Sequence, residues 1–122
     1  MTDITREVRD VVSRSQVQSG LVTVFIQHTS ASLCIQENAA PAVQRDIETA
    51  LMKLFPEGPH YEHDDEGPDD MPGHLRALVT RTSETIPVTD GALLLGTWQA
   101  LYVLEHRRHP HTRKLFVHVA GE

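Results

Sequence analysis

Apolar residues recur with helical spacing near the start of the chain. They fall at positions i, i+4, i+7 and i+8, the pattern of a helix with one apolar face: Ile4, Val8, Val11 and Val12. Thr2 or Asp3 stands just before this stretch and can cap its first turn. The sequence therefore predicts that the chain opens with an amphipathic helix.

A second stretch with helical spacing predicts a longer helix. Asn38 can cap it, Pro41 is tolerated in its first turn, and Pro56 ends it. Its apolar face carries Val43, Ile47, Ala50, Leu51 and Leu54. At about 100° per residue, Asp46 lies roughly 40° from Ala50 around the helix axis, so we expect this carboxylate to be half-buried.

A third, short helix is predicted after Asp69 or Asp70. Its apolar residues again fit one face: Met71, Leu75, Leu78 and Val79. His74 lies about 40° from Leu78 around the same axis and therefore borders that face.

Shorter apolar runs predict strands. Residues 21–27 follow a glycine and are nearly continuously apolar, which is typical of a strand buried on both faces and central in its sheet. Residues 33–36 predict a second short strand. In the last third of the chain apolar and polar residues alternate with a period of two, and an Asp90-Gly91 turn predicts antiparallel pairing. The strands expected there are 85–88, 92–95, 100–105 and 114–119. Since no repeat or linker interrupts the chain, we expect a single α+β domain over residues 1–122.

Length and charge exclude several classes of protein. The chain has 122 residues, too few for the roughly 250 of a TIM barrel. Its 17 acidic and 11 basic side chains give a formal net charge of −6, which disfavours nucleic acid and anionic membranes as partners. No run approaches the roughly 18 apolar residues of a membrane span.

The single cysteine, Cys34, cannot form an intramolecular disulfide, and the first residues lack a secretory signal. We therefore expect a cytoplasmic protein in which Cys34 is a small buried apolar residue.

Charge is concentrated in two segments. Between Glu57 and Asp70 the chain has seven acidic side chains, two histidines and no lysine or arginine, and its prolines and glycines predict a loop. The segment from Glu105 to His118 holds half of the eight histidines and a basic cluster of Arg107, Arg108, Arg113 and Lys114. Each segment is either a solvated surface or a binding site. As binding sites, the acidic segment would suit a cation and the basic segment an anion.

Three histidines stand where a binding site is favoured. His28 ends the predicted central strand, His63 lies in the acidic loop and His74 borders a helix face. Three neutral imidazoles can bind a metal ion and leave positions open for water or substrate, although their spacing matches no metal motif. The alternatives are partly buried histidines with hydrogen-bonding partners and histidines that act as acid or base.

Arginine side chains favour an anion site near the last turn. A guanidinium group binds phosphate through two parallel hydrogen bonds, and Arg107, Arg108 and Arg113 flank the His109-Pro110-His111 turn.

Two further positions are candidates for ligand contact. Trp98 is either part of the core or faces a planar ring. Gln99 and Glu105 share one face of a predicted strand, where a carboxylate needs a partner.

With these residues in place, the chain resembles the YjbQ-like family, whose members have been described as secondary thiamine-phosphate synthases. The motifs that carry the resemblance extend over nearly the whole chain. They are His28-Thr29-Ser30-Ala31-Ser32-Leu33, Glu37-Asn38, Pro41, Asp46, Tyr61-Glu62-His63-Asp64, Glu66-Gly67, Asp69-Asp70-Met71-Pro72, His74, Gly91, Gly96-Thr97-Trp98-Gln99, Glu105-His106, Arg113 and Gly121-Glu122.

The resemblance implies a small α+β fold with an antiparallel, sandwich-like sheet and flanking helices, assembled as a homotrimer. Members usually carry a strand or hairpin before the first helix, which this sequence lacks. A divalent metal ion, zinc or magnesium, is implied at His28, His63 and His74. On the same basis we expect catalytic roles for Glu37, Asn38, Asp46 and Glu105. Substrate binding is expected for Ser30, Tyr61, Trp98, Gln99 and Arg113.

The first functional hypothesis is an enzyme that joins an aminopyrimidine methyl pyrophosphate to a thiazole phosphate and releases pyrophosphate, as a side activity. A divalent cation and the arginines would stabilise the departing pyrophosphate. Trp98 or Tyr61 would face the pyrimidine ring, and Glu37 or Glu105 would orient ring nitrogens. The alternatives are a metal-dependent hydrolase or binding protein for a small phosphorylated metabolite, and a trimeric scaffold without activity.

Overall fold

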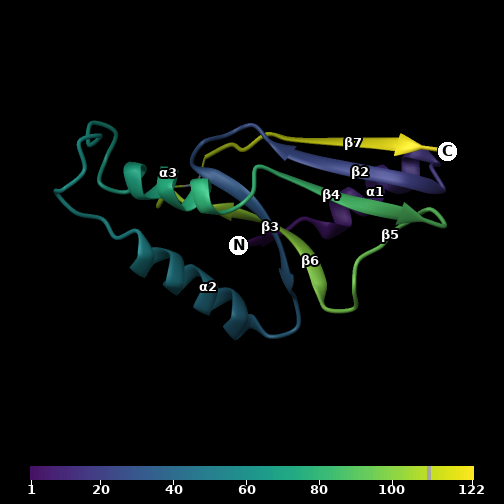
Figure 1. Ribbon diagram of the computed structural model, residues 1–122, viewed down its shortest axis with the longest axis horizontal. Coiled ribbons are helices and arrows are strands. Elements are labelled where there is room, and N and C mark those ends of the chain that lie inside the picture. The colour runs from purple at the N-terminus through teal and green to yellow at the C-terminus, as the bar shows by residue number, and fades with distance from the viewer. Residues whose placement is uncertain (110) are drawn as a thin grey trace.

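The computed structural model describes residues 1–109 and 111–122 (Figure 1). Pro110, in the predicted last turn, lies outside the described residues. The elements in chain order are β1 (Thr2–Asp3), α1 (Thr5–Ser15), β2 (Ser19–Ile26), β3 (Ala31–Glu37), α2 (Pro41–Leu54), α3 (Asp70–Val79), β4 (Ser83–Thr89), β5 (Ala92–Leu93), β6 (Gln99–Glu105) and β7 (Leu115–Gly121). All three predicted helices are present, and every predicted strand overlaps an observed one.

The strands form two antiparallel sheets, which confirms the predicted α+β class. Sheet A has the strand order β1-β6-β3, and sheet B has the order β5-β4-β2-β7, so β2 is an inner strand as predicted. The main core lies between the sheets, where helix α1 contributes Val8 and Val12. The turn at Asp90 and Gly91 has positive φ at both residues, as a tight hairpin turn requires.

Strand β2 is buried on one face only. Val24 and its alternate neighbours point into the core, whereas Leu21 is exposed and Phe25 is 43% exposed. The prediction of burial on both faces is therefore wrong for the single chain. Phe25 pairs with Phe116 of β7, which is also exposed, so the outer face of sheet B presents an apolar patch.

Strand β6, by contrast, is buried on both faces. Leu101 belongs to the main core, while Tyr102 and Leu104 form a second cluster against which Leu51 of α2 packs. Cys34 is half-buried against the same cluster, and burial raises the pKa of its thiol to about 11. The thiol is therefore neutral at physiological pH and fits the apolar role expected for it.

Helices α2 and α3 bury the faces that their apolar spacing predicts only in part, since Val43, Ile47 and Leu51 of α2 and Met71 and Leu75 of α3 are half-buried. No residue of α2 is fully buried, and Asp46 is exposed where we expected it to be half-buried. On α3, Leu78 is 77% exposed and Val79 is exposed, while Asp70 and Arg76 are buried. The inner face of α3 meets charged and carbonyl partners, so polar side chains point inward there. Among the described residues, no helix has the length and apolar run needed to cross a bilayer.

A buried polar network joins sheet A to helix α3. The Thr80 hydroxyl donates to Oγ of Ser32 at 2.6 Å, and the same Oγ lies 2.8 Å from Nε2 of His106. The Ser32 hydroxyl is therefore available to donate to the imidazole. Burial, reinforced by the positive charge of Arg76, lowers the pKa of His106 to about 4, so this imidazole is neutral at pH 7.

We predict that acid destabilises the fold through His106. Its pKa falls from 6.5 to about 4 on folding, so the folded state favours the neutral imidazole. The stability from this group is complete above pH 6.5 and is lost as the pH falls towards 4, by roughly 3 kcal/mol in total. Urea unfolding at pH 7 and pH 4.5 measures the loss. The His106→Gln variant removes the titrating group and should lose less; an equal loss in both proteins would contradict the prediction.

Candidate functional site

The register of strands β3 and β6 separates the predicted site residues into two groups. Ala31 lies opposite Glu105, and Glu37 lies opposite Gln99. Six residues at about 3.3 Å each place the two ends of this strand pair roughly 20 Å apart. At one end lie Glu37, Asn38, Trp98 and Gln99. Near the other end lie His28, Ser30, Glu105 and Arg113.

The first group makes mainly structural contacts within the chain. Oε2 of Glu37 accepts two backbone N–H groups at the approach to α2, at 3.2 and 2.9 Å, in the place where we expected Asn38 to cap. The side chain of Gln99 accepts the backbone N–H of Gly96 at 2.8 Å. Trp98 is 63% exposed, which excludes the core and leaves its ring free to contact a ligand or another chain.

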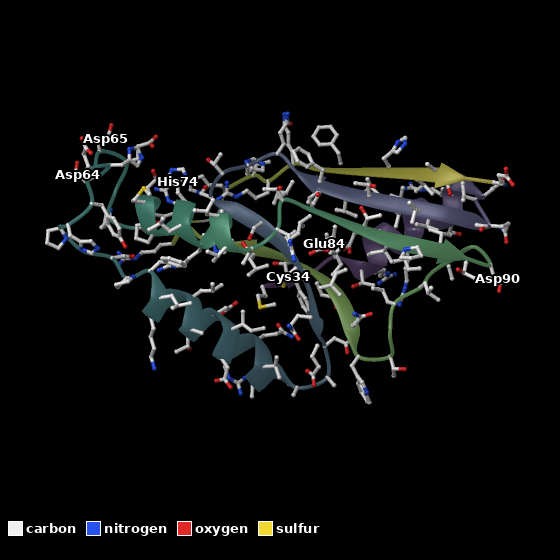
Figure 2. The ribbon with its side chains drawn as sticks, viewed as in Figure 1. Cys34, Asp64, Asp65, His74, Glu84 and Asp90 are labelled. Atoms are coloured by element: carbon white, nitrogen blue, oxygen red, sulfur yellow. The ribbon has the colours of Figure 1, made fainter. Side chains whose placement is uncertain are left out.

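Three side chains at the start of helix α3 converge and can hold a metal ion. His63, Asp70 and His74 each offer a ligand atom, and these atoms lie within 4.8 Å of one another. Nε2 of His63 lies 2.8 Å from Oδ2 of Asp70, and Nε2 of His74 lies 3.2 Å from the same oxygen. Asp70 and His74 are four residues apart, so one helix face presents both to His63. Figure 2 shows His74 on α3, near the loop whose tip carries Asp64 and Asp65.

The donor set fits a divalent ion. Bonds of about 2.0–2.2 Å around a tetrahedral ion place ligand atoms roughly 3.4 Å apart, so each imidazole needs to move away from Oδ2 of Asp70 by about 0.6 Å or less. Nδ1 of His74 lies 3.0 Å from the carbonyl oxygen of Thr29, and donation there leaves Nε2 free for a metal. Two imidazoles and one carboxylate favour zinc over magnesium and leave positions open, as in catalytic sites.

The charges around this cluster keep the carboxylate ionised. Burial pushes the pKa of Asp70 upward, but the hydrogen bond from His63 and the charges of His74 and Arg107 outweigh it, so the pKa lies below its usual value. The hydrogen bond to Asp70 in turn raises the pKa of His63. The cluster therefore has an anionic centre that attracts a proton or a metal cation.

Arg107 fixes the orientation of Asp70. Its Nη1 donates to Oδ1 of Asp70 at 2.9 Å, and its Nε donates to Oδ2 of Asp69 at 3.1 Å. Its Nη2 donates to the carbonyl oxygen of Glu66 at 2.9 Å. Because the arginine holds Oδ1, only Oδ2 of Asp70 faces the two histidines.

Arg113 and its neighbours form a second polar group. Its guanidinium holds both carboxylate oxygens of Glu105, with Nε 2.8 Å from Oε1 and Nη2 on Oε2. Nη2 also donates to the carbonyl oxygen and the hydroxyl of Ser30, at 3.2 and 3.1 Å. Burial pushes the pKa of Glu105 upward, but the hydrogen bond from Arg113 outweighs it and lowers the pKa. The guanidinium that we expected to bind phosphate is thus held by a carboxylate.

His28 does not join the metal cluster. Its Nε2 accepts the backbone N–H of Lys114 at 2.7 Å, and its Nδ1 lies 3.5 Å from Nη1 of Arg113. Burial, followed by the charge of Arg113, lowers the pKa of this imidazole. Among the described residues, the set that converges is therefore His63 and His74 with Asp70, and not the three histidines expected.

The other two arginines of the basic segment also have carboxylate partners. Arg107 pairs with Asp69 and Asp70, and Arg108 pairs with Glu57. The acidic loop and the basic segment, which we expected to form a cation site and an anion site, therefore neutralise each other in part.

An open hollow of about 620 Å³ lies beside the metal cluster, and His63 forms part of its lining. Tyr61 and Met71 supply its less polar wall. The Tyr61 hydroxyl donates to the carbonyl oxygen of Pro56 at 2.8 Å, and its ring lies 4.1 Å from that of His60, centroid to centroid. Tyr61, expected to bind substrate, is thus next to the cluster.

Sequence reasoning missed Asp70 and Arg107 as parts of this site. The spacing of four between Asp70 and His74 is a usable signal, although Asp70 is expected from the sequence only to cap the helix and to belong to the family motif. Arg107 carried no signal beyond its place in a basic cluster, because its partners lie 37 and 38 residues away.

Known proteins are similar to the chain over its whole length. The family described as UPF0047 protein YjbQ-like matches residues 1–122. UPF0047 protein sll1880 of Synechocystis is 52% identical over 117 residues, which cover 95% of this chain and 80% of that protein. UPF0047 protein YjbQ of Salmonella typhimurium is 43% identical over 120 residues, which cover 98% of this chain and 87% of that protein.

Solved structures share the two-sheet fold. A crystal structure of an uncharacterized YjbQ/UPF0047 family protein from Clostridium acetobutylicum gives a TM-score of 0.90 at 41% identity, covering 97% of this chain and 88% of that one. A YbjQ-like protein of unknown function from Sulfolobus solfataricus gives a TM-score of 0.90 at 25% identity, covering 99% and 86%.

We predict that this chain binds one Zn²⁺ through His63, Asp70 and His74. In calorimetric titration with Zn²⁺, His63→Gln and His74→Gln should each weaken binding at least about 100-fold, because each removes one of three ligands. His28→Gln is the matched control and should keep the wild-type affinity. Loss of binding in His28→Gln with retention in His63→Gln would show that the ligand set is different.

Proposed function

The chain belongs to the YjbQ-like UPF0047 family, and we propose that it is a cytoplasmic, metal-dependent enzyme acting on small phosphorylated metabolites, with a secondary thiamine-phosphate synthase activity. In that reaction an aminopyrimidine methyl pyrophosphate and a thiazole phosphate form thiamine phosphate, and pyrophosphate leaves. The observation that carries the proposal is the convergence of His63, Asp70 and His74 beside an open hollow.

The chain's own residues supply binding and orientation. A divalent ion, when bound, stabilises the charge of the departing pyrophosphate. Asp70, held by Arg107, and the two imidazoles would hold the ion at the edge of the hollow. Tyr61 forms the wall against which the pyrimidine ring stacks.

Arg113 is the residue we propose for a phosphate group. A phosphate that takes the place of Glu105 keeps both hydrogen bonds of the guanidinium fork. The Ser30 hydroxyl, which accepts from Arg113, can donate its own hydrogen to the same phosphate. Glu105, once released, is free to orient a ring nitrogen of the substrate.

We propose a homotrimer in which two chains complete one site. Glu37, Asn38 and Trp98 lie at the far end of sheet A, roughly 20 Å from Glu105, so only a neighbouring chain can bring them to the same ligand. The exposed apolar pair Phe25 and Phe116 supports association through the outer face of sheet B.

Hydrolysis or simple binding of a phosphorylated metabolite is the second candidate function. Oε2 of Glu66 lies 3.3 Å from Nε2 of His63, so a carboxylate stands beside the cluster where it can take a proton from an attacking water. Three ligands also leave space for that water.

Formation of thiamine phosphate tests the first function. Wild-type protein with both substrates and Zn²⁺ or Mg²⁺ should form the product, and Asp70→Asn should lower the rate at least about 100-fold because the buried ligand loses its charge. Asp10→Asn makes the same change on the exposed side of α1 and should keep the wild-type rate.

The same assay separates the candidate functions. Release of phosphate from the pyrimidine substrate alone, without the thiazole phosphate, would favour the hydrolase. Binding of either substrate without turnover would favour the binding protein. Neither turnover nor binding in a folded, metal-loaded protein would refute both and leave a trimeric scaffold.

Light scattering tests the assembly. The wild-type protein should have three times the 13.7 kDa mass of one chain at micromolar concentration, and Phe116→Glu should shift it to the monomer by placing a charge on the apolar patch. Thr49→Glu adds the same charge to an exposed position of α2, outside sheet B, and should leave the mass unchanged. A wild-type monomer would refute the trimer.

A further inference from the structure

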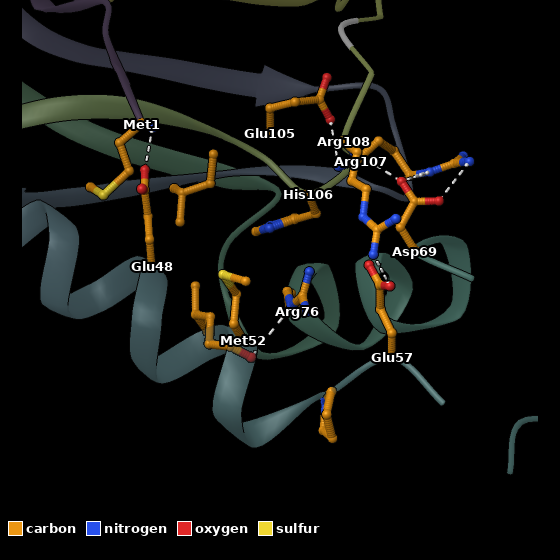
Figure 3. Close-up of a pocket in the computed structure, with 13 residues that line it drawn as sticks. Met1, Glu48, Met52, Glu57, Asp69, Arg76, Glu105, His106, Arg107 and Arg108 are labelled. Atoms are coloured by element: carbon orange, nitrogen blue, oxygen red, sulfur yellow. Dashed lines mark hydrogen bonds and ion pairs between the residues drawn. The ribbon is translucent and has the colours of Figure 1, made fainter. Parts of the chain in front are cut away.

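A separate pocket of about 510 Å³ lies between helices α2 and α3 and strand β6 (Figure 3). None of the three metal-cluster side chains lines it. Leu51 and Met52 of α2 and Leu104 of β6 form its apolar surface. Arg76 of α3 lies at this surface beneath His106, as Figure 3 shows. The pocket therefore combines an apolar surface with one deeply placed cation.

Arg76 differs from the other charged groups around this pocket. The Met1 ammonium pairs with Glu48, and the other arginines and acids of the lining form ion pairs of their own. Arg76 is only 9% exposed, yet no described carboxylate lies within ion-pair distance of it. A buried charge of this kind costs free energy unless a group of opposite charge compensates it.

The hydrogen bonds of Arg76 hold its guanidinium in place. Nε donates to the carbonyl oxygen of Leu51 at 3.4 Å, and Nη2 donates to that of Phe55 at 2.8 Å. These carbonyls end helix α2, so the arginine also neutralises the negative end of the helix. Two of five N–H groups are used, and the described residues offer no acceptor for Nη1.

We propose that this pocket binds a small organic monoanion, a carboxylate with an apolar body, through Arg76. Nη1 donates to the carboxylate, and the apolar body lies on Leu51, Met52 and Leu104. The volume is in the usual range for small-molecule sites, about 300–1,000 Å³. This site is independent of the proposed function, because it needs neither the metal ion nor the hollow beside it.

The charge of the lining favours a monoanion over a phosphate ester. Arg76 supplies one positive charge without an ion-pair partner among the described residues, whereas Glu48, Glu57, Asp69 and Glu105 are each held in an ion pair with another cation. A dianion therefore finds one unpaired cation there and keeps a second negative charge uncompensated. The same argument disfavours a neutral ligand, which leaves the arginine uncompensated.

Methyl NMR of the full chain tests the site directly, because the methionines report on two places: Met1 and Met52 line this pocket, and Met71 does not. Met52 lines this pocket, and Met71 lines the hollow beside the metal cluster. Titration with benzoate should shift the Met52 methyl resonance and leave that of Met71 in place. Benzamide has the same shape without the charge and should bind at least about tenfold more weakly than benzoate. Phenyl phosphate should also bind at least about tenfold more weakly than benzoate.

Variants separate the pocket from the stability of the fold. Met52→Glu keeps Arg76 and places a carboxylate within the pocket, so benzoate binding, measured by calorimetry, should fall at least about tenfold. Ala50→Glu adds the same charge to an exposed position of α2 that does not line the pocket, and should bind benzoate as the wild type does. Equal affinities of Met52→Glu and wild type, equal binding of benzoate and benzamide, or no shift of Met52 in the wild type would each overturn the proposal.

Discussion

One guanidinium group determines how the acidic loop, helix α3 and strand β6 fit together. Arg107 follows β6 closely in the chain and binds Asp69, Asp70 and the Glu66 carbonyl at once. Asp70 is 4% exposed, and a carboxylate so far from water costs several kcal/mol unless a cation compensates it. The hydrogen bond to Asp69 raises the pKa of Arg107 further, so the pairing persists across physiological pH. The loop carries many like charges, and this single cation draws its last residues against the sheet.

The consequences of this pairing extend to the candidate site. Arg107 occupies one oxygen of Asp70 and turns the other towards His63 and His74. His74 is held from its far side by the Thr29 carbonyl, and Thr29 lies in the turn that leads into β3. The cluster is therefore anchored on a helix, a strand connection and the end of β6, although its residues are distant in sequence. Such support from outside the ligand set is what keeps metal ligands in a fixed geometry.

Element type was predictable from the sequence, and burial was less so. Period-two and helical spacing depend on local geometry alone, so the three helices and the strands that follow α1 lie where the pattern predicts them. The two-residue strand β1, where only a helix cap was expected, depends on its pairing with β6 and has no such pattern. Which face is buried depends on neighbours that a spacing rule cannot see. An apolar run such as β2 has the same pattern whether its outer residues, Leu21 and Phe25, meet solvent or another chain. The predicted buried face of α3 is only partly correct for a related reason: Asp70 and Arg76 are held inside by partners from distant parts of the chain.

Contacts between distant parts of the chain also decide which charged residues indicate a binding site. Their clustering in the sequence suggests Arg107, Arg108 and Arg113 as anion-binding residues. In a small domain that also carries a dense acidic loop, however, these arginines pair with carboxylates of the same chain. Neutralised pairs of this kind are poor candidates for binding an external anion, unless the ligand displaces a carboxylate. Arg76 stands alone among apolar residues of a helix, so no charge count singles it out, but this isolation explains why no carboxylate of the described residues pairs with it on folding. In a chain with an acidic excess, a buried cation without an acidic partner therefore indicates where an external anion gains most free energy.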